Sequence, residues 1–165
     1  MWSGALMEEL GLLHLHRAIY LPTIGGKVAG DVLNIFLAQR WGRLRTLRLG
    51  FLGATLSTLG YALPGLGSAS VITIAFCQGV FTDILWCNMY IYLVERLPTT
   101  VRSTGFGFAM GLGRSGGVVS SALGGLFSSM QTAFITYAAA FALGAAVAFF
   151  PSVETARRPL ADTVA

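Results

Sequence analysis

Five long apolar stretches, separated by short turns, constrain what this chain can fold into more than any other feature of its sequence. A helix needs about 20 mainly apolar residues to cross the hydrocarbon core of a bilayer, and each stretch is close to that length. The pattern therefore predicts an all-α integral membrane region with about five transmembrane helices. The expected spans are residues 20–38, 49–66, 71–94, 104–126 and 132–150.

The composition supports the membrane prediction. Of the 165 residues, 55% are hydrophobic and 11% are charged, whereas soluble domains carry about 25% charged residues. A soluble helical protein of this size would need many more polar residues to cover its surface. The net charge of +4 could suggest a nucleic-acid partner. The arginines cluster at the ends of apolar stretches instead of spreading over one face, so we expect no nucleic acid.

The turns between the stretches alternate in charge. Residues 39–48 hold four arginines, and residues 95–102 and 151–158 are also charged. Residues 64–70 and 128–131 hold no charged side chain. Because Lys and Arg are enriched in the cytoplasmic turns of membrane proteins, we expect the charged turns in the cytoplasm and the uncharged turns outside.

The two ends of the chain differ from its middle. Residues 1–19 mix acidic side chains, histidines and Arg17 with leucines, so we expect an amphipathic or irregular segment that does not span the bilayer. Residues 151–165 are expected to form a cytoplasmic tail. The localisation that follows is a multi-pass protein of a bacterial inner membrane or a eukaryotic plasma or organelle membrane.

Polar side chains inside the apolar stretches are candidates for a substrate pathway, because a charge at the centre of a bilayer costs about 3 kcal/mol. Lys27, Asp31 and Asn34 share one face of a helix through their i, i+4, i+7 spacing. The Lys and Asp can pair, so this face lines a water-filled cavity or holds a structural ion pair. Asp83 and Asn88 lie in the third stretch, where Asp83 is either functional or a structural hydrogen-bond acceptor.

The fourth stretch is rich in glycine and contains a sixth candidate, Arg114. This residue lies eleven positions beyond Ser103, which places it roughly 16 Å along a helix and near the bilayer midplane. Small residues four positions apart let helix backbones approach closely, so we expect this stretch to pack against other helices. The expected packing residues are Gly107, Gly111, Gly113 and Gly117.

A charged turn joins the third and fourth stretches between Tyr92 and Gly105. Pro98 lacks a backbone N–H and drives Leu97 away from helical conformations, so one helix must end before it. A new helix can begin after Thr99 or Thr100. The pattern aromatic-x-x-Glu-x-x-Pro-Thr-x-x-Arg-x-x-Gly resembles the loop between the tenth and eleventh helices of major facilitator superfamily transporters. The likeness is strongest to sugar porters, organic ion transporters and bacterial aromatic-acid:proton symporters.

Three further segments resemble the same superfamily in the same order. The run Gln39-Arg-Trp-Gly-Arg-Leu-Arg45 is similar to the inter-helix signature Asp-Arg-x-Gly-Arg-Arg, with Gln39 in place of the Asp. Gly113-Arg-Ser-Gly116 is similar to the Gly-Arg-x-Gly of the eleventh helix. Glu154-Thr155, followed by Leu160, is similar to the ending after the last helix of sugar porters. The resemblance implies helices eight to twelve of a twelve-helix fold.

The resemblance also implies a function and a set of partners. It implies part of a secondary active transporter for a sugar, an organic ion or an aromatic acid, with a proton as a candidate co-substrate. The expected partners are membrane lipid, the small organic solute, and an amino-terminal transporter half or another copy of this chain. We expect the chain to be inactive alone. The resemblance implies a cytoplasmic gate formed by Arg40, Arg43, Glu95 and Arg102.

Two alternatives remain from the sequence. The chain could be a non-transporting membrane fragment that associates with other helices through its glycine-rich stretch. A membrane enzyme is less favoured, because no His-Glu-x-x-His, Gly-x-Ser-x-Gly or Gly-x-x-x-x-Gly-Lys motif is present. We expect no cofactor and no metal. His14 and His16 point to different faces of a helix, and Cys77 and Cys87 lack the spacing of zinc ligands.

Overall fold

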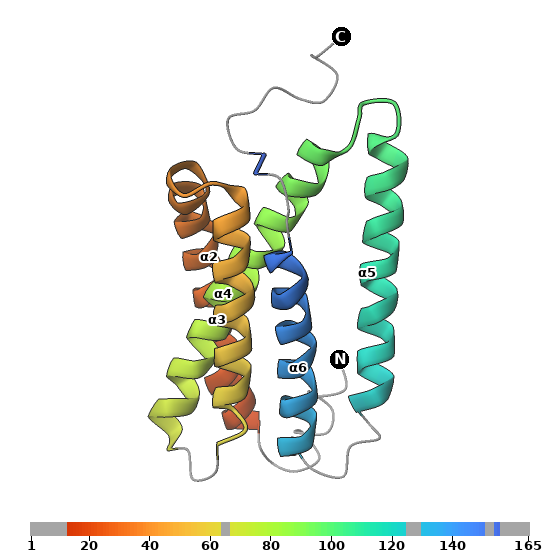
Figure 1. The fold of residues 1–165 in the computed structure, drawn as a ribbon. Helices are drawn as coiled ribbons and strands as arrows, with labels where there is room; N and C mark the ends of the chain where they lie inside the picture. Colours follow the sequence, from red (N-terminus) through yellow and green to blue (C-terminus); the bar gives the residue numbers. More distant parts are fainter. Residues whose placement is uncertain (1–12, 64–66, 125–129, 151–153, 156–165) are drawn as a thin grey trace.

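A computed structural model describes residues 13–63, 67–124, 130–150 and 154–155 (Figure 1). This part of the chain contains five helices and no strand, which confirms the all-α prediction. The helices run roughly side by side, and the turns that join them lie at the two ends of the bundle (Figure 1). The helices are α2 (Leu13–Arg40), α3 (Arg43–Gly60), α4 (Ser68–Arg96), α5 (Arg102–Gly124) and α6 (Met130–Phe149).

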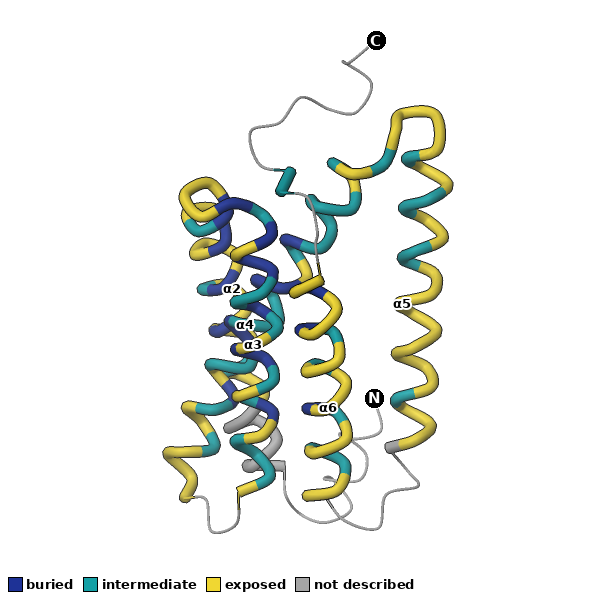
Figure 2. The backbone as a smooth tube through the Cα atoms, in the orientation of Figure 1, coloured by how far each residue is buried: buried dark blue, intermediate teal, exposed yellow. Residues whose placement is uncertain are grey.

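Helix α4 is the centre of the bundle. It packs against α2 and α3, while α6 packs on α3. Helix α5 makes few contacts with α4 and stands at one edge (Figure 1). The buried residues gather where α2, α3 and α4 meet, whereas most of α5 is exposed (Figure 2). The described chain therefore consists of a packed group of four helices and one helix at its margin.

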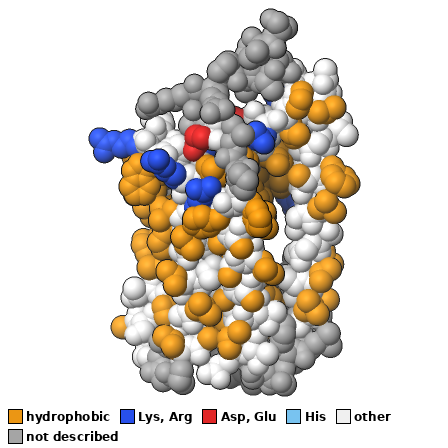
Figure 3. Space-filling view, in the orientation of Figure 1, with side chains coloured by type: hydrophobic (Ala, Val, Ile, Leu, Met, Phe, Trp, Pro, Cys, Tyr) orange, Lys and Arg blue, Asp and Glu red, His pale blue; other side chains and the backbone are white. Residues whose placement is uncertain are grey.

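The outer surface of the bundle is largely apolar. Large hydrophobic side chains such as Leu56, Phe108 and Leu143 are exposed. Figure 3 shows hydrophobic side chains over the body of the molecule and Lys and Arg side chains at one end. Among the described helices, Ser68–Arg96 and Gln131–Phe149 are long and apolar enough to cross a membrane by themselves. Charged side chains or frequent glycines lower the hydropathy of the other three helices.

The helices extend beyond the apolar stretches that predict them. Helix α2 already begins at Leu13 and α3 at Arg43, because a backbone can remain hydrogen-bonded as a helix where its side chains become polar. The predicted break at Pro98 is confirmed. Helix α4 ends at Arg96, Leu97 is extended with φ −91° and ψ 131°, and α5 begins at Arg102.

Glycines bring the backbones of α2 and α4 into direct contact. A Cβ atom added to Gly30 would lie 2.6 Å from the Val80 carbonyl oxygen, and one added to Gly79 would collide with the Thr23 carbonyl oxygen. A side chain at either position would push the two helices apart. The sequence analysis did not predict this contact between α2 and α4.

Most of the α5 glycines face open space in the described part of the chain, whereas a Cβ added to Gly105 would lie 3.1 Å from Leu97 Cδ1. A Cβ added to Gly107, Gly111, Gly113 or Gly117 would meet no atom within 4 Å. Their expected packing against other helices stays a prediction. Parts of other expectations also lie outside the described residues: residues 1–12 and 156–165, the side chains of His14 and His16, and parts of the uncharged turns.

Candidate functional site

The charged residues of α2 meet those of α4 across the closest helix contact. Lys27 Nζ lies 4.0 Å from Asp83 Oδ1, and the Asp83 side chain is 20% exposed. One turn further along α2, Asp31 Oδ1 accepts a hydrogen bond of 3.0 Å from Cys87 Sγ. The Asp31 and Asp83 carboxylates are also near enough to interact electrostatically. Two carboxylates, one ammonium group and one thiol therefore lie together.

A buried amide pair continues this contact. Asn88 Nδ2 donates to Asn34 Oδ1 and also to the Ile84 carbonyl oxygen. Asn88 is fully buried and Asn34 is 5% exposed. Asn88 Oδ1 accepts no hydrogen bond from any described residue. We call the whole set of paired side chains the polar seam: Lys27, Asp31 and Asn34 of α2, and Asp83, Cys87 and Asn88 of α4.

The polar seam explains why the polar side chains of α2 share one face. The face meets another helix, and each of its three residues has its own partner on α4. The partner of Lys27 is Asp83, instead of the Asp31 one turn away that the sequence suggests. Helix periodicity shows which residues share a face, but it does not show which residues a neighbouring helix places opposite them.

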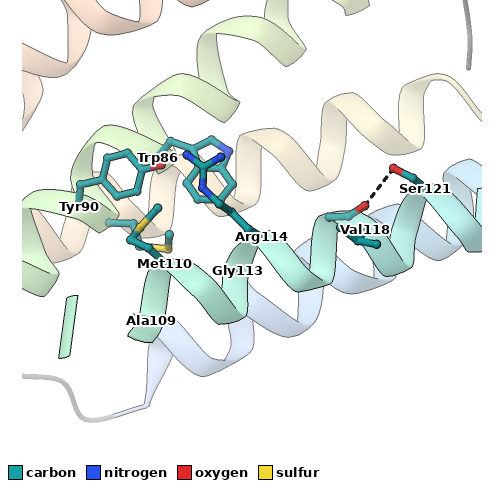
Figure 4. Close-up of a pocket in the computed structure, with 10 residues that line it drawn as sticks. Trp86, Tyr90, Ala109, Met110, Gly113, Arg114, Val118 and Ser121 are labelled. Carbon is teal, nitrogen blue, oxygen red and sulfur yellow. Dashed lines mark hydrogen bonds between the residues drawn. The ribbon is translucent and has the colours of Figure 1, made fainter. Parts of the chain in front are cut away.

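A cavity of about 660 Å³ lies between α4 and α5. Trp86, Met89 and Tyr90 line it from α4, while Met110 and Arg114 line it from α5. Figure 4 shows Arg114 and Trp86 on facing helices, with both side chains directed into this space. Its volume lies in the range of about 300–1,000 Å³ typical of small-molecule sites. The hollow beside α5 is also visible in Figure 3.

Aromatic rings form one wall of the cavity. The ring centroids of Trp86 and Tyr90 are 5.7 Å apart, and those of Tyr90 and Phe106 are 6.0 Å apart. A guanidinium group beside aromatic faces suits a flat ligand that carries a carboxylate, because Arg binds carboxylates bidentately and aromatic rings stack on one another. Asp83 and Trp86 are one helical turn apart on α4, so the polar seam and the cavity lie on neighbouring sides of that helix.

The charged ends of α3 and α4 meet the segment that follows α6. Arg43 Nε lies 3.2 Å from Glu95 Oε1, and both side chains are 22% exposed. Thr155 Oγ1 donates to Glu95 Oε2 over 2.5 Å. We call Arg43, Glu95, Glu154 and Thr155 the end cluster. It joins three segments that are far apart in the sequence.

Glu154 caps the amino-terminal end of α3. Its carboxylate accepts hydrogen bonds from the backbone N–H groups of Arg43 at 2.9 Å and Leu44 at 3.2 Å. A negative charge is favourable at this end of a helix. Gly42 has φ +89°, and a Cβ there would lie 2.8 Å from Glu154 Oε2. The positive φ allows a tight turn at Gly42, and the glycine also makes room for the cap.

The chain matches the family model of the Major Facilitator Superfamily over residues 5–164. It belongs to the major facilitator superfamily. This assignment makes it an integral membrane protein of a transporter family and not an enzyme. It also confirms the family that the sequence motifs indicate.

Named relatives of this superfamily member are bacterial transporters. The benzoate transport protein of Acinetobacter baylyi is 29% identical over 79% of this chain. The gentisate transporter of Corynebacterium glutamicum is 29% identical over 76%, and the niacin transporter of Acinetobacter baylyi is 28% identical over 72%. The matches cover 28%, 28% and 27% of these relatives, so the chain spans less than a third of their length.

In the structure, the four gate candidates of this superfamily member have different surroundings and do not form one cluster. Arg43 and Glu95 are directly paired. Arg102 Nε donates to the Leu97 carbonyl oxygen at 3.2 Å, where it caps the end of α4. Arg40 is exposed at the end of α2 and forms no ion pair with a described residue. The gate role of all four residues stays a prediction.

Sequence reasoning missed Cys87 and Glu154 as site residues. The sequence analysis considered Cys87 only as a zinc ligand, although it lies four residues after Asp83 on the same helix face. Glu154 was noted only as part of a terminal motif. One signal was available for it: α3 begins after Gly42, which has no side chain to cap the helix. An acceptor from elsewhere in the chain was therefore to be expected.

Proposed function

We propose that this segment forms the carboxy-terminal helices of a secondary transporter for a small aromatic acid. The observation that carries the proposal is the cavity, which combines the Arg114 guanidinium with the rings of Trp86 and Tyr90. Arg114 binds the carboxylate of the solute, and the two rings contact its aromatic ring. The named relatives support this class, because benzoate, gentisate and niacin are all aromatic carboxylates.

The cavity favours an aromatic acid over a sugar. A sugar requires several polar groups arranged around its hydroxyls, whereas the lining here is mostly aromatic, thioether and glycine with one cation. The superfamily resemblance includes sugar porters, but the curated relatives described above carry names of organic acids. An organic ion without a ring could not stack on the aromatic faces of Trp86 and Tyr90.

Further helices complete the proposed transporter. Solute sites of secondary transporters lie near the bilayer midplane between two structural repeats. The cavity here has walls from α4 and α5, and the glycines of α5 leave room for helices outside this segment. We therefore expect no uptake by the 165-residue chain alone. Saturable gradient-driven uptake by the purified chain in vesicles would contradict this part of the proposal.

The open glycine face of α5 also favours the alternative of a non-transporting fragment. Such a fragment would associate with other helices through Gly107, Gly111, Gly113 and Gly117, around which the described chain leaves space. It would need no solute, so a solute-binding measurement separates the two functions.

Benzoate binding to the purified chain in detergent tests the cavity. Replacing Trp2 and Trp41 with Phe leaves Trp86 as the reporter of fluorescence. A charge-assisted hydrogen bond contributes about 1.5–3 kcal/mol, so Arg114→Gln should weaken binding at least about tenfold. Arg45→Gln is the matched control outside the cavity and should bind as the parent does. Benzamide, which has the ring but no charge, should bind weakly to both.

Two results would contradict the aromatic-acid site. One is the absence of any benzoate-dependent fluorescence change in the parent chain. The other is equal benzoate affinity of the parent chain and Arg114→Gln. Either result would leave the membrane fold intact and favour the non-transporting fragment.

We further propose that the end cluster faces the cytoplasm, where it would hold a gate closed. The charge alternation of the turns supports this orientation. In a variant without other cysteines, Arg45→Cys should react with membrane-impermeant reagents only after the cells are opened. Ser68→Cys, at the start of α4, should react from outside intact cells. The reverse labelling pattern would contradict the orientation.

A further inference from the structure

We propose that the edge of the bundle between the start of α3 and the end of α6 is a binding site for an anionic phospholipid. The phosphate of the lipid binds Arg45 and Arg48, and its acyl chains lie on an apolar face of α3. We call the exposed side chains of this face, Leu52, Leu56 and Leu59, the leucine stripe. The site is separate from the cavity between α4 and α5, and lipid binding does not depend on the solute.

Arg48 is held in place by the end of α6. Its Nε donates to the Ala148 carbonyl oxygen at 2.9 Å, and its guanidinium carbon lies 4.9 Å from the centroid of the Phe149 ring. The hydrogen bond satisfies a carbonyl at the end of a helix, which is the structural role of Arg48. It uses one of five guanidinium N–H groups. The other four donate to no described residue, so an oriented guanidinium remains to bind a phosphate.

Arg45 adds a second cation without a carboxylate partner. It lies three residues before Arg48, so the two side chains are neighbours on one face of α3. Arg45 is exposed, and neither arginine forms an ion pair with a described residue. The described carboxylates at this end have other partners, since Glu95 pairs with Arg43 and Glu154 caps α3. Two like charges one turn apart repel each other, so a bound anion stabilises both.

The leucine stripe continues the face of the two arginines along α3. Positions 45, 48, 52, 56 and 59 follow the spacing of three and four residues that keeps side chains on one helix face. Leu52, Leu56 and Leu59 are 45%, 69% and 42% exposed. From Arg48 to Leu59 the face extends roughly 16 Å, at a rise of 1.5 Å per residue. That length is about half of the 30 Å hydrocarbon core, which is the depth of one leaflet.

A shallow apolar groove adjoins the leucine stripe. It has a volume of about 290 Å³ and lies between α3 and α4, with Leu56 and Gly60 on one side and Ile74 and Phe81 on the other. The opposite flank of the stripe is bounded by α6, which packs on α3. A phospholipid has two acyl chains, and the stripe and the groove provide a surface for each.

The combination of cations and exposed leucines favours a phospholipid over other anionic partners. A nucleic acid or an acidic peptide would leave the leucine stripe in water, whereas a lipid covers both parts of the site. Figure 3 shows Lys and Arg side chains at one end of the molecule and hydrophobic side chains over the adjoining body. Trp41, in the turn before α3, is 51% exposed, and Trp is enriched at the depth of lipid head groups.

The cytoplasmic leaflet is the expected source of the lipid. Anionic lipids of this leaflet attract basic residues near its surface. The choice of leaflet rests on the orientation proposed above for the end cluster, which includes Arg43 two residues before Arg45. Binding of the head group by the two arginines does not rest on that orientation.

Native mass spectrometry of the purified 165-residue chain in detergent micelles tests the site. The probes are phosphatidylglycerol and phosphatidylcholine with identical oleoyl chains, because these lipids differ in net head-group charge. The parent chain should bind phosphatidylglycerol at least about tenfold more tightly. Arg45→Gln should weaken this binding about fivefold, and Arg45→Gln/Arg48→Gln about twenty-five-fold, since each basic residue contributes a similar increment.

Matched variants separate the site from general attraction to the bundle. Arg40→Gln/Arg96→Gln removes two exposed charges from the ends of α2 and α4 and should retain phosphatidylglycerol binding. Leu56→Asn should weaken the binding of both lipids, whereas Leu112→Asn, at an exposed position of α5, should weaken neither. Helix content from circular dichroism identifies variants that do not fold. Arg45→Gln changes an exposed side chain, so it tests the site without disturbing the end of α6.

Four outcomes would overturn the proposal. The first is equal phosphatidylglycerol affinity of the parent chain and Arg45→Gln, and the second is equal affinity of the parent chain for the two lipids. The third is an equal loss in the double variant and its Arg40→Gln/Arg96→Gln control. The fourth is displacement of the lipid by an equal concentration of glycerol 3-phosphate, which would indicate a site for small anions alone.

The mass spectra also test a second copy of this chain as the occupant. A dimer that Arg45→Gln/Arg48→Gln dissociates would identify the edge as a contact between copies and would overturn the lipid site. Monomers with bound phosphatidylglycerol support it. Because no organic acid is present, these results are independent of the Arg114 binding test, and either proposal can fail while the other stands.

Discussion

The α2–α4 contact and helix α5 are both rich in glycine, yet their surroundings are opposite. Gly30 and Gly79 lie against the backbone of the other helix, and polar side chains beside them are paired across the contact. Gly113 and Gly117 on α5 have no atom near the position of a Cβ, and Arg114 between them points into a cavity. The presence of small residues therefore indicates that a helix can pack closely, but not which partner it packs against.

The largest expected effect comes from adding a methyl group to each kind of glycine. Gly79→Ala places a Cβ against the Thr23 carbonyl and should lower the free energy of unfolding by about 3 kcal/mol, the upper end for overpacking. Gly113→Ala meets no neighbour and improves helix propensity, so it should raise stability by up to about 1 kcal/mol. Circular dichroism during denaturant unfolding in micelles measures both.

The glycine comparison would be wrong if the two alanine variants changed stability in the same direction and by similar amounts. If both variants were more stable, α2 and α4 would be free to separate. If both were less stable, α5 would be packed within the isolated chain. Gly107→Ala repeats the test at a second open position of α5.

The buried amide pair should have the next largest effect. Asn88→Leu leaves Asn34 buried without its partner, and an unsatisfied buried polar group costs about 1–3 kcal/mol. We expect a loss of about 2 kcal/mol. The double variant Asn34→Leu/Asn88→Leu removes both amides and should recover most of this loss. Additive losses in unfolding experiments would show that the two side chains are not coupled.

The end cluster tests whether a partly exposed ion pair contributes less than the buried amide pair of Asn34 and Asn88. Arg43 and Glu95 are 22% exposed, so their pairing should contribute at most about 1 kcal/mol. In a complete transporter made by fusing a compatible first half, Arg43→Gln and Glu95→Gln should shift the conformational balance by similar amounts. The double variant should add little. Cysteine accessibility from the cytoplasmic side measures this shift, and fully additive effects would exclude a shared gate.

The smallest expected effect concerns the contact between α5 and α6. The Tyr137 hydroxyl donates to the Ser120 carbonyl oxygen at 3.1 Å. Tyr137→Phe should lower stability by about 0.5–1 kcal/mol and increase the deuterium exchange of α5 relative to α2. Thr136→Val, which removes a neighbouring hydroxyl that bonds within its own helix, is the control. Equal exchange in α5 and α2 would contradict the marginal position of α5.

The sequence by itself determined the helices, their interruption and the family. Apolar stretches of spanning length predict helices because the backbone in a bilayer must satisfy its own hydrogen bonds. Pro98 ends α4 because it excludes the helical conformation at Leu97. The spacing of Lys27, Asp31 and Asn34 places them on one face because of the helix period, whatever the helix packs against. All of these are local consequences of residue type and order.

Only the tertiary structure decided which side chains meet. Lys27 and Asp83 are 56 positions apart, and their pairing depends on how α2 and α4 cross at Gly30 and Gly79. Glu154 reaches the start of α3 only because α6 returns the chain to that end of the bundle. Arg114 faces Trp86 because α5 stands opposite α4. The helix period determines which residues share a face. The close packing of the backbones determines which residues of a neighbouring helix lie opposite that face.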